Sequence, residues 1–257
     1  MDNRPIGIFD SGLGGISVLS AIHSLMPQEH IIYLGDNGNA PYGPRSAEEI
    51  ITLSLACVNQ LMKQGVKAVV IACNTASSVA TDIIREQVDI PIIAMEPAIR
   101  PAKGMVNGGK VLVLATEATL SLNRYRDRVM ELAMDDQVIN LPCPTFVTLV
   151  EEGMDDPMAW QAEIERVFSP IRHENIDVVV LGCTHFPHIL PQLAPYLEDI
   201  FPGCQIIHGN DGTARQLLRV LERENLLAHR EQIGNIVFQT SGDAQKYIPL
   251  MERLFQG

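Results

Sequence analysis

The sequence lacks the features that mark a membrane or secreted protein. No run of apolar residues approaches the roughly 18 residues that a membrane-spanning helix needs. The opening residues, Met1–Pro5, show neither the basic start nor the apolar stretch of a signal peptide. We therefore expect a cytoplasmic protein with no membrane partner.

The short motifs of several large enzyme classes are also missing. There is no Walker A loop, no G-x-S-x-G nucleophile elbow and no H-E-x-x-H metal-binding helix. Neither Cys73 nor Cys183 is followed six residues later by arginine, so the loop of the cysteine phosphatases is absent. Only five lysines occur, none in an evident Schiff-base setting, which disfavours pyridoxal chemistry. We expect neither a cofactor nor a metal.

Positive charge is scarce as well. The 257 residues include 19 Lys and Arg against 31 Asp and Glu, which gives a formal net charge of −12. An acidic surface repels a phosphate backbone, so we expect no nucleic-acid partner. Hydrophobic residues make up 46% of the chain, enough to build one large or two small packed domains.

Cysteines are few, and their spacing is not that of a disulfide framework. The five cysteines are Cys57, Cys73, Cys143, Cys183 and Cys204, and none forms a C-x-x-C pair. This pattern predicts free thiols in a reducing compartment rather than disulfides, zinc ligands or a redox pair. Some of these thiols are then packing residues, and others are candidates for chemistry.

Short runs rich in β-branched residues recur between helical patterns. They predict strands at residues 6–9, 31–34, 68–72, 91–95, 110–115, 138–141, 177–181 and 205–208. Helices are predicted at residues 15–26, 46–64, 76–87, 119–133, 157–172, 188–198, 211–226 and 243–255. Ser46 followed by Glu49 predicts a capping box for the second helix. Apolar strands alternating with helices indicate an α/β fold with mostly parallel sheets buried on both faces.

The first four predicted strands match the last four in spacing. Equivalent positions lie 105, 107, 109 and 114 residues apart, in the pairs Ile6–Val111, Ile31–Val138, Val69–Val178 and Ile92–Ile206. The third strands also match in letters, with VVIACNT at 69–75 against VVLGCTH at 179–185. Strand alternation alone produces some regularity. We nevertheless expect two similar three-layer lobes, related by a pseudo-twofold axis, with the active site in the cleft between them.

Each predicted lobe therefore carries a cysteine just after its third strand. Ligands of open α/β sheets bind at the carboxyl ends of the strands, where a following helix N-terminus favours a thiolate. Two facing thiols, Cys73 and Cys183, would suit removal of a proton from one face of a carbon and delivery to the other. The alternative is that both are buried packing residues, as free cysteines often are. Their matched positions favour the chemical interpretation.

The first strand ends in a second candidate cluster, Asp10–Gly15. Its glycines suit a tight turn whose amides can hold a carboxylate. Ser17 stands where a dinucleotide fingerprint needs its third glycine, and an aspartate at the strand tip would repel a pyrophosphate. Asp10 could instead contact a substrate ammonium or assist a neighbouring acid or base. Its alternative role is to cap the following helix.

Further candidates follow from position alone. His185, two residues after Cys183, could polarise that thiol. Tyr42 lies in a rigid turn after the second strand, and the pair Glu151 and Glu152 lies where a loop of the second lobe could reach the site. For each of these, an ordinary structural or solvated role is the alternative.

Four segments together resemble the glutamate racemases of the aspartate/glutamate racemase family. They are FDSGLGG at 9–15, PYG at 41–43, ACNTA at 72–76 and GCTHFP at 182–187, supported by MEP at 95–97 and LVEEG at 149–153. Each segment alone is weakly specific, but four in this order are strongly so. The resemblance runs from about Ile6 to the C-terminal region.

The resemblance implies a role for each matching residue. Cys73 would be the base that acts on D-glutamate, assisted by Asp10, and Cys183 the base that acts on L-glutamate, assisted by His185. Asp36 and Glu151 match acidic residues near the site. Substrate-binding positions are matched by Asp10, Ser11, Tyr42, Gly43, Asn74, Thr75, Thr184 and His185.

The resemblance also implies the wider biology. The chain would interconvert L- and D-glutamate without a cofactor, supply D-glutamate for peptidoglycan and so serve cell-wall biogenesis and cell shape. Its partners would be glutamate and, in a homodimer, a second copy. By analogy the first lobe would span residues 1–96 plus 207–257 and the second 97–206.

The sequence departs from the family pattern in places. Residues 37–40 read NGNA where many members have a Thr-Ala-Arg-like stretch, Phe186 replaces a tyrosine, and His188 stands where an aliphatic residue is common. None of these changes touches the paired cysteines. An aspartate racemase, or an inert binder of a small anionic ligand, remains an alternative.

Overall fold

The computed structural model describes residues 2–229 and 232–256 and divides into two compact units. The first unit comprises Met1–Glu96 together with Asn210–Gly257, and the second comprises Pro97–Gly209. The first is therefore built from both ends of the chain. Within the described residues, no helix is long and apolar enough to cross a membrane.

The first unit is built on a five-stranded sheet in the order β4-β3-β1-β2-β9. Its strands are β1 (Ile6–Asp10), β2 (Ile31–Gly35), β3 (Ala68–Ile71), β4 (Ile92–Ala94) and β9 (Ile236–Thr240). The second unit has a four-stranded sheet in the order β6-β5-β7-β8. These strands are β5 (Lys110–Ala115), β6 (Val138–Pro142), β7 (Ile176–Leu181) and β8 (Gln205–His208). Every described strand pair is parallel, as predicted.

Four strands of the first sheet match the four strands of the second. The order β4-β3-β1-β2 of the first reappears as β8-β7-β5-β6 in the second. In the first sheet Ile6 pairs with Ala68, and in the second Val111 pairs with Val178. Counting on from these pairs, Cys73 and Cys183 each stand two residues past the end of the third strand, at the same register position. The predicted similarity of the two halves is confirmed at the level of strand order and register.

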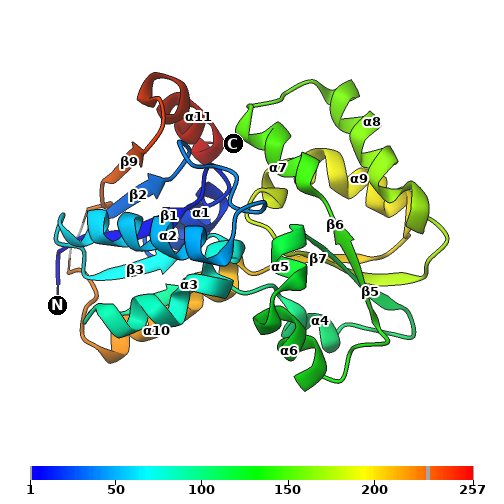
Figure 1. Ribbon diagram of the computed structural model, residues 1–257, viewed down its shortest axis with the longest axis horizontal. Coiled ribbons are helices and arrows are strands. Elements are labelled where there is room, and N and C mark those ends of the chain that lie inside the picture. The colour runs from blue at the N-terminus through cyan, green and yellow to red at the C-terminus, as the bar shows by residue number, and fades with distance from the viewer. Residues whose placement is uncertain (1, 230–231, 257) are drawn as a thin grey trace. The chain divides into compact units, whose positions relative to one another are not determined.

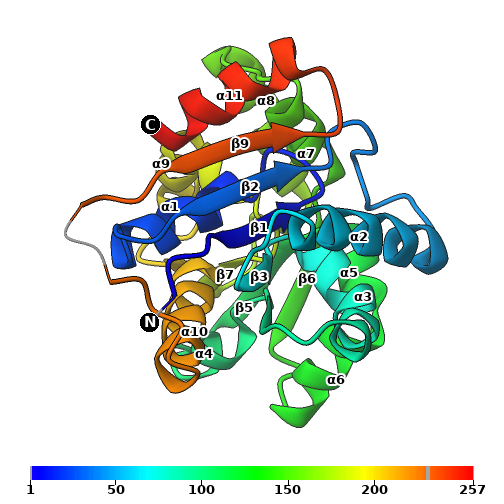
Figure 2. The ribbon, with the colours of Figure 1, turned by 90° about the vertical axis from the view of Figure 1, so that its left-hand side faces the viewer.

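Each sheet is covered by helices on both faces, which makes each unit three-layered (Figures 1 and 2). Alternate side chains of one strand point to opposite faces, so Ile8 and Phe9 of β1 belong to different hydrophobic clusters. In the first unit α1 (Ile16–Leu25), α10 (Asn210–Arg223) and α11 (Ala244–Gln256) cover one face, and α2 (Ala47–Met62) and α3 (Asn74–Gln87) the other.

In the second unit the same layering is built from other helices. One face packs against α7 (Pro144–Glu151), α8 (Pro157–Phe168) and α9 (Leu190–Ile200), and the other against α4 (Ile99–Lys103) and α6 (Asn123–Glu131). The short α5 (Glu117–Ser121) precedes α6. The second unit also contains two short 3-10 helices, η1 (Ser169–Ile171) after α8 and η2 (Phe186–Ile189) before α9.

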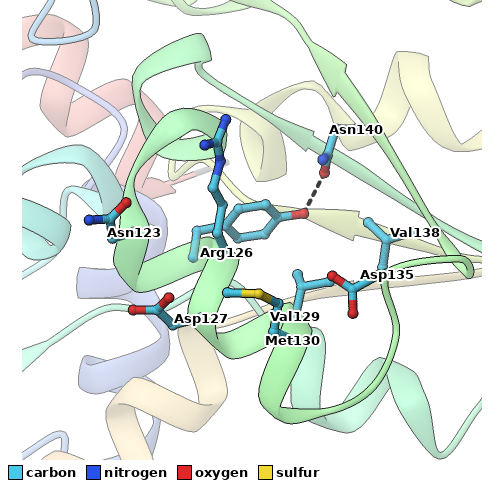
Figure 3. A pocket seen from close by; sticks show the side chains of 9 residues that line it. Asn123, Arg126, Asp127, Val129, Met130, Asp135, Val138 and Asn140 are labelled. Atoms are coloured by element: carbon cyan, nitrogen blue, oxygen red, sulfur yellow. Dashed lines mark hydrogen bonds between the residues drawn. The ribbon is translucent and has the colours of Figure 1, made fainter.

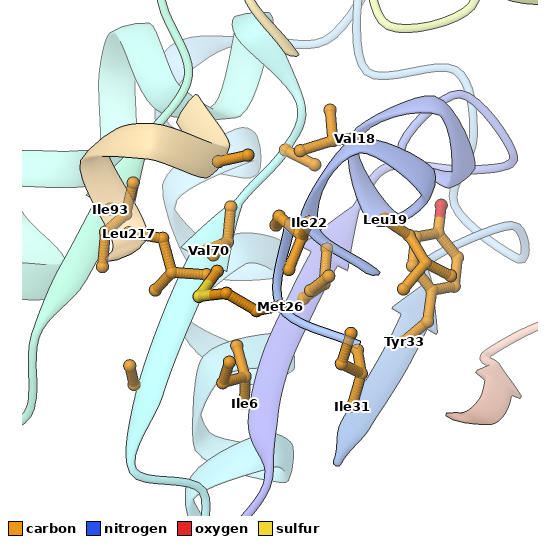
Figure 4. Packing of buried hydrophobic residues seen from close by; sticks show 14 of the residues in the cluster. Ile6, Val18, Leu19, Ile22, Met26, Ile31, Tyr33, Val70, Ile93 and Leu217 are labelled. Carbon is orange, nitrogen blue, oxygen red and sulfur yellow. The ribbon is translucent and has the colours of Figure 1, made fainter. Parts of the chain in front are cut away.

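Figure 4 shows the packing of the first unit's inner layer. Ile22 of α1 and Leu217 of α10 lie over Val70 and Ile6 of the sheet. All four side chains are fully buried. Burial of each aliphatic side chain of this kind contributes about 1.5–3 kcal/mol, so this layer stabilises β1 and β3, the strands that lead to the candidate site.

The predicted helices are present with small shifts, and three elements escaped prediction. The capping box of Ser46 and Glu49 is formed as expected. The single helix predicted at 119–133 is broken between α5 and α6. Helices α4 and α7 and strand β9 were not predicted. The sequence predicted two matched sets of four strands. Strand β9 has no counterpart in the other set, so the matched spacing gave no sign of it.

Strand β9 creates the main difference between the two sheets. It pairs with β2 along the outer edge of the first sheet, Ile31 beside Ile236. In the second sheet the equivalent strand, β6, is an edge strand. A cavity of about 480 Å³ lies beside that edge between α6 and β6, where Tyr125 donates a hydrogen bond to the Asn140 side chain (Figure 3). None of the predicted site residues lines this cavity.

A buried ion pair fastens the two chain ends into the first unit. Lys67 Nζ lies 2.5 Å from Glu29 Oε2, and their side chains are 0% and 3% exposed. The ammonium also donates to the carbonyl oxygen of Asp2 at 2.7 Å, and Glu29 Oε1 accepts from the Ala228 amide at 2.8 Å. Four separate stretches of chain therefore meet at one pair of charges.

Candidate functional site

The carboxyl end of β1 is shaped by a glycine turn. Asp10, fully buried, accepts a hydrogen bond from the Gly12 amide at 2.8 Å, and Tyr33 donates to the Gly12 carbonyl at 2.7 Å. A Cβ at Gly15 would lie 2.6 Å from the Asp10 Cβ, so only glycine fits there. Helix α1 is capped at Gly15 without a side-chain hydrogen bond, so Asp10 is not its cap.

Cys73 caps helix α3 with its own sulfur. The Ala76 amide donates to Sγ at 3.4 Å, and the Ser11 hydroxyl donates to the same sulfur at 3.3 Å. Both donors favour negative charge on the sulfur, and the helix N-terminus adds its dipole. The helix begins at Asn74, earlier than predicted, because Cys73 serves as its N-cap. The local structure is suited to hold a thiolate.

The side-chain amide of Asn74, beside Cys73, is buried and has no hydrogen-bond partner among the described residues. The residue is 3% exposed, and neither its Nδ2 nor its Oδ1 has a hydrogen-bond partner in the described part of the chain. Leaving a buried amide unsatisfied costs stability. A polar ligand at this end of the sheet would supply the missing hydrogen bonds.

Asp36 and Tyr42 form a buried pair in the loop after β2. The Tyr42 hydroxyl donates to Asp36 Oδ2 at 2.5 Å, and the Asp36 amide donates to the Asp10 carbonyl at 2.9 Å. Tyr42 is 1% exposed, and burial, with the neighbouring Cys57 and Asp36, raises the pKa of its phenol far above the usual range. The phenol therefore stays protonated and turned inward, so it anchors the turn that contains Gly43.

The second unit places a histidine and a carboxylate behind its cysteine. Cys183 Sγ lies 3.5 Å from His185 Nδ1, and His185 Nε2 lies 2.7 Å from Glu151 Oε1. Glu151 is the last residue of α7. Thr184, between the cysteine and the histidine, is 2% exposed. A chain of sulfur, imidazole and carboxylate results, the arrangement that activates nucleophiles and bases.

Charge around His185 favours its protonated form. Burial alone would lower the pKa of this imidazole, but the hydrogen bonds and charges of Cys183 and Glu151 outweigh burial and raise the pKa well above its usual value. An imidazolium beside Cys183 stabilises a thiolate there. Both units thus provide for a negatively charged sulfur.

The other cysteines are surrounded differently. Burial raises the pKa of the Cys57 thiol and of the Cys143 thiol, and neighbouring negative charge adds to it. Burial also raises the pKa of Cys204. All five cysteines are free thiols. Within residues 2–229 and 232–256, no group of three or more His, Cys, Asp or Glu side chains could hold a metal ion.

The structure sorts the predicted residues into two groups, one in each unit. Seven predicted residues contact one another: Ser11 donates to Cys73, Tyr42 donates to Asp36, and His185 lies between Cys183 and Glu151. Sequence analysis could not show that Glu151 reaches His185, since it did not predict α7. It also missed Ser241, which bonds Asp36 across 205 positions of sequence.

Comparison with known proteins identifies the family to which this sequence and fold belong. The profile of the family described as Asp/Glu/Hydantoin racemase matches residues 13–217. The chain is 40% identical over 256 residues to a glutamate racemase of Clostridium botulinum, covering 99% of this chain and 98% of that protein. It is 38% identical to the glutamate racemase of Clostridium acetobutylicum, over 98% of this chain and 97% of that one.

Solved structures agree. The glutamate racemase isoform RacE1 of Bacillus anthracis superposes with a TM-score of 0.86 at 32% identity, covering 100% of this chain and 96% of that one. The Francisella tularensis enzyme, solved with D-glutamate, gives 0.83 at 31% identity, over 100% of this chain and 95% of that one. This chain therefore belongs to the Asp/Glu/Hydantoin racemase family. Within that family it is an amino-acid racemase similar to the glutamate racemases.

Proposed function

We propose that the protein interconverts L- and D-glutamate by moving one proton at Cα, with Cys73 and Cys183 as the two acid–base groups. The observation that carries this proposal is the equivalent placement of the two cysteines after the third strand of matched sheets. Relatives named glutamate racemase, matched over nearly the whole chain, support the choice of substrate. So do related structures solved with D-glutamate and with L-glutamate.

In the proposed mechanism, the two thiols act on opposite faces of the Cα of one glutamate. For D-glutamate, the Cys73 thiolate takes the α-proton and the Cys183 thiol gives its proton to the opposite face. Cys73 ends as thiol and Cys183 as thiolate, and the reverse reaction exchanges these roles. No redox change occurs, so the steps need no further reactant.

The surroundings of each sulfur support its role. Ser11 and the start of α3 stabilise the Cys73 thiolate, while His185, held by Glu151, stabilises the Cys183 thiolate. Asp10 is proposed to assist at Cys73. The remaining binding positions are Tyr42, Gly43, Asn74, Thr75 and Thr184. The unsatisfied amide of Asn74 supports contact with a polar substrate.

The weak acidity of Cα is the main barrier. Backbone amides and helix dipoles at the substrate's carboxylates would stabilise the charge that develops there. The cellular role we propose is supply of D-glutamate for peptidoglycan in the cytoplasm, by a homodimer.

The test uses purified protein and D-glutamate in D₂O with no added cofactor. We expect L-glutamate to form, followed by chiral chromatography, and to carry deuterium at Cα, because the donating thiol exchanges with solvent. Aspartate supplied in place of glutamate should turn over far more slowly. Faster turnover of aspartate would make the protein an aspartate racemase, and absence of deuterium with both substrates would leave only a binder.

A further inference from the structure

Asp36 is the centre of a hydrogen-bond network that joins the C-terminal segment to the Tyr42 turn. Its Oδ2 accepts from the Tyr42 hydroxyl at 2.5 Å. Its Oδ1 accepts from the Ser241 hydroxyl at 2.5 Å and from Asn39 Nδ2 at 3.0 Å. The carboxylate is 2% exposed, so three neutral donors replace the water that it loses on burial.

Ser241 lies in the turn between β9 and α11, and its side chain is committed to this loop. Besides donating to Asp36, its hydroxyl oxygen accepts from the Gly38 amide at 3.0 Å. The neighbouring Thr240 hydroxyl donates to Asn37 Oδ1 at 2.8 Å. Two adjacent residues of the C-terminal segment thus hold the loop after β2 at consecutive points.

The packing beneath the loop leaves it little freedom. A Cβ at Gly35 would lie 2.6 Å from Asn37 Oδ1 and 2.7 Å from the Met251 methyl of α11. The end of β2 is therefore pressed between its own loop and α11. Movement of the β9–α11 turn would carry the loop with it.

The hydrogen bonds on Asp36 fix both its carboxylate and the position of Tyr42. Because Ser241 and Asn39 hold Oδ1, the remaining oxygen accepts from Tyr42, whose side chain is buried. The Tyr42 ring in turn fixes the turn that carries Gly43.

We propose that Ser241 is a positioning residue for substrate binding, acting through Asp36 on the Tyr42 turn. This inference rests on the proposed function, since it assigns the Tyr42 turn to the glutamate site. Strand β9 and the turn after it are then part of the binding machinery. Among the described residues, the second sheet has no strand equivalent to β9.

The first test asks whether the connection exists and needs no turnover. The protein is labelled with 3-fluorotyrosine, and the resonance of Tyr42 among the five tyrosines is assigned by its loss in Tyr42→Phe. We expect Ser241→Ala to shift the Tyr42 fluorine resonance. Ser20→Ala, which removes a hydroxyl that bonds only the Ile16 carbonyl within α1, should not shift it. An unmoved resonance in Ser241→Ala would overturn the proposal.

The second test is a kinetic cycle. Ser241→Ala should raise KM for glutamate about tenfold and leave kcat within about threefold, because substrate binding rather than proton transfer is disturbed. In a Tyr42→Phe background the same change should have no further effect, since the Asp36–Tyr42 bond is already gone. Effects of the two changes that simply multiply would contradict the proposed connection. If no racemisation occurs at all, the proposed function fails, while the fluorine shift still decides whether Ser241 positions Tyr42.

Discussion

The two units share a backbone plan and differ in how each serves its cysteine. Both sheets have the same order of four strands, and both cysteines follow the third strand at the same position. Around Cys73 the negative sulfur is favoured by hydrogen-bond donors and a helix N-terminus. Around Cys183 it is favoured by an imidazole backed by a carboxylate. A scaffold that repeats can therefore supply the same charge by two different chemistries.

A second comparison concerns the residue after the second strand. The Asp36 amide donates to the carbonyl of Asp10, at the end of β1, and the Cys143 amide donates to the carbonyl of Ala115, at the end of β5. Asp36 and Cys143 thus occupy equivalent backbone positions. The aspartate gathers hydroxyl and amide donors, whereas the Cys143 thiol is fully buried in an apolar cluster. At this backbone position, the described residues form a polar network in the first unit and an apolar cluster in the second.

The largest expected effect tests whether Cys73 and Cys183, at matched positions of the two sheets, also have matched roles in catalysis. Cys73→Ala and Cys183→Ala should each lower kcat/KM for both enantiomers by about 10⁴-fold, because each removes one of two required proton carriers. Cys204→Ala, at a half-buried thiol whose pKa is raised, should stay within about threefold. Chiral chromatography of both reactions measures the loss. Near-normal turnover by either variant would break the equivalence.

The next effect concerns the buried pair that fastens the first unit. Lys67→Met leaves the Glu29 carboxylate buried without its cation, and should lower the free energy of unfolding by about 3–5 kcal/mol. Hydrogen exchange should show the lost protection in residues 2–96 and 210–256, with little change in 97–209. Urea denaturation gives the size of the effect.

Two further variants test whether the unpaired charge of Glu29 causes this loss of stability. Lys67→Met combined with Glu29→Met removes both charges and should recover much of the stability. Arg223→Ala, which breaks an exposed pair with Glu224, should cost no more than about 1 kcal/mol. Equal destabilisation by the single and double changes would mean that packing, rather than the unpaired charge, is responsible.

Much of the architecture was accessible from the sequence because it depends on local patterns. Apolar strands between helices predicted two parallel sheets, and the repeated spacing with the letters around Cys73 and Cys183 predicted their equivalence. Strand β9 escaped because its partner, β2, lies about two hundred residues earlier, as Ser241 lies 205 residues from Asp36. Contacts at such separations depend on where the chain returns, which no local pattern records.

The contact between Glu151 and His185 was inaccessible for a related reason. The contact requires that α7 end at Glu151. The carboxylate of Glu151, and not that of Glu152, then faces the imidazole of His185. The two glutamates are adjacent in sequence and differ only in their direction from the helix. Their position in the chain alone named the pair without choosing between them, and only the family resemblance singled out Glu151.

The choice between those two glutamates gives a prediction of intermediate size. Glu151→Gln keeps a hydrogen-bonding group near His185 and removes the charge, so kcat/KM should fall about 10²-fold. The fall should be equal in both directions, because the equilibrium constant between enantiomers is fixed at one. The alkaline limb of the pH–rate profile should move to lower pH, since the carboxylate that raises the His185 pKa is gone. Glu152→Gln, at the exposed neighbour, should change neither quantity.

The smallest expected effect is the dependence of stability on the His185 proton. The folded protein binds this proton more tightly than the unfolded chain, whose histidine pKa is about 6.5, because the pKa is raised in the fold. His185 therefore stabilises the fold fully below about pH 6.5. That contribution is lost as the pH rises through the raised pKa. Urea unfolding of the wild type and of His185→Asn, repeated across this range, should give a difference in unfolding free energy that falls with rising pH. A difference that grows with pH would mean that burial of the neutral imidazole prevails, and the second unit would then lack the fixed positive charge that sets its cysteine apart from Cys73.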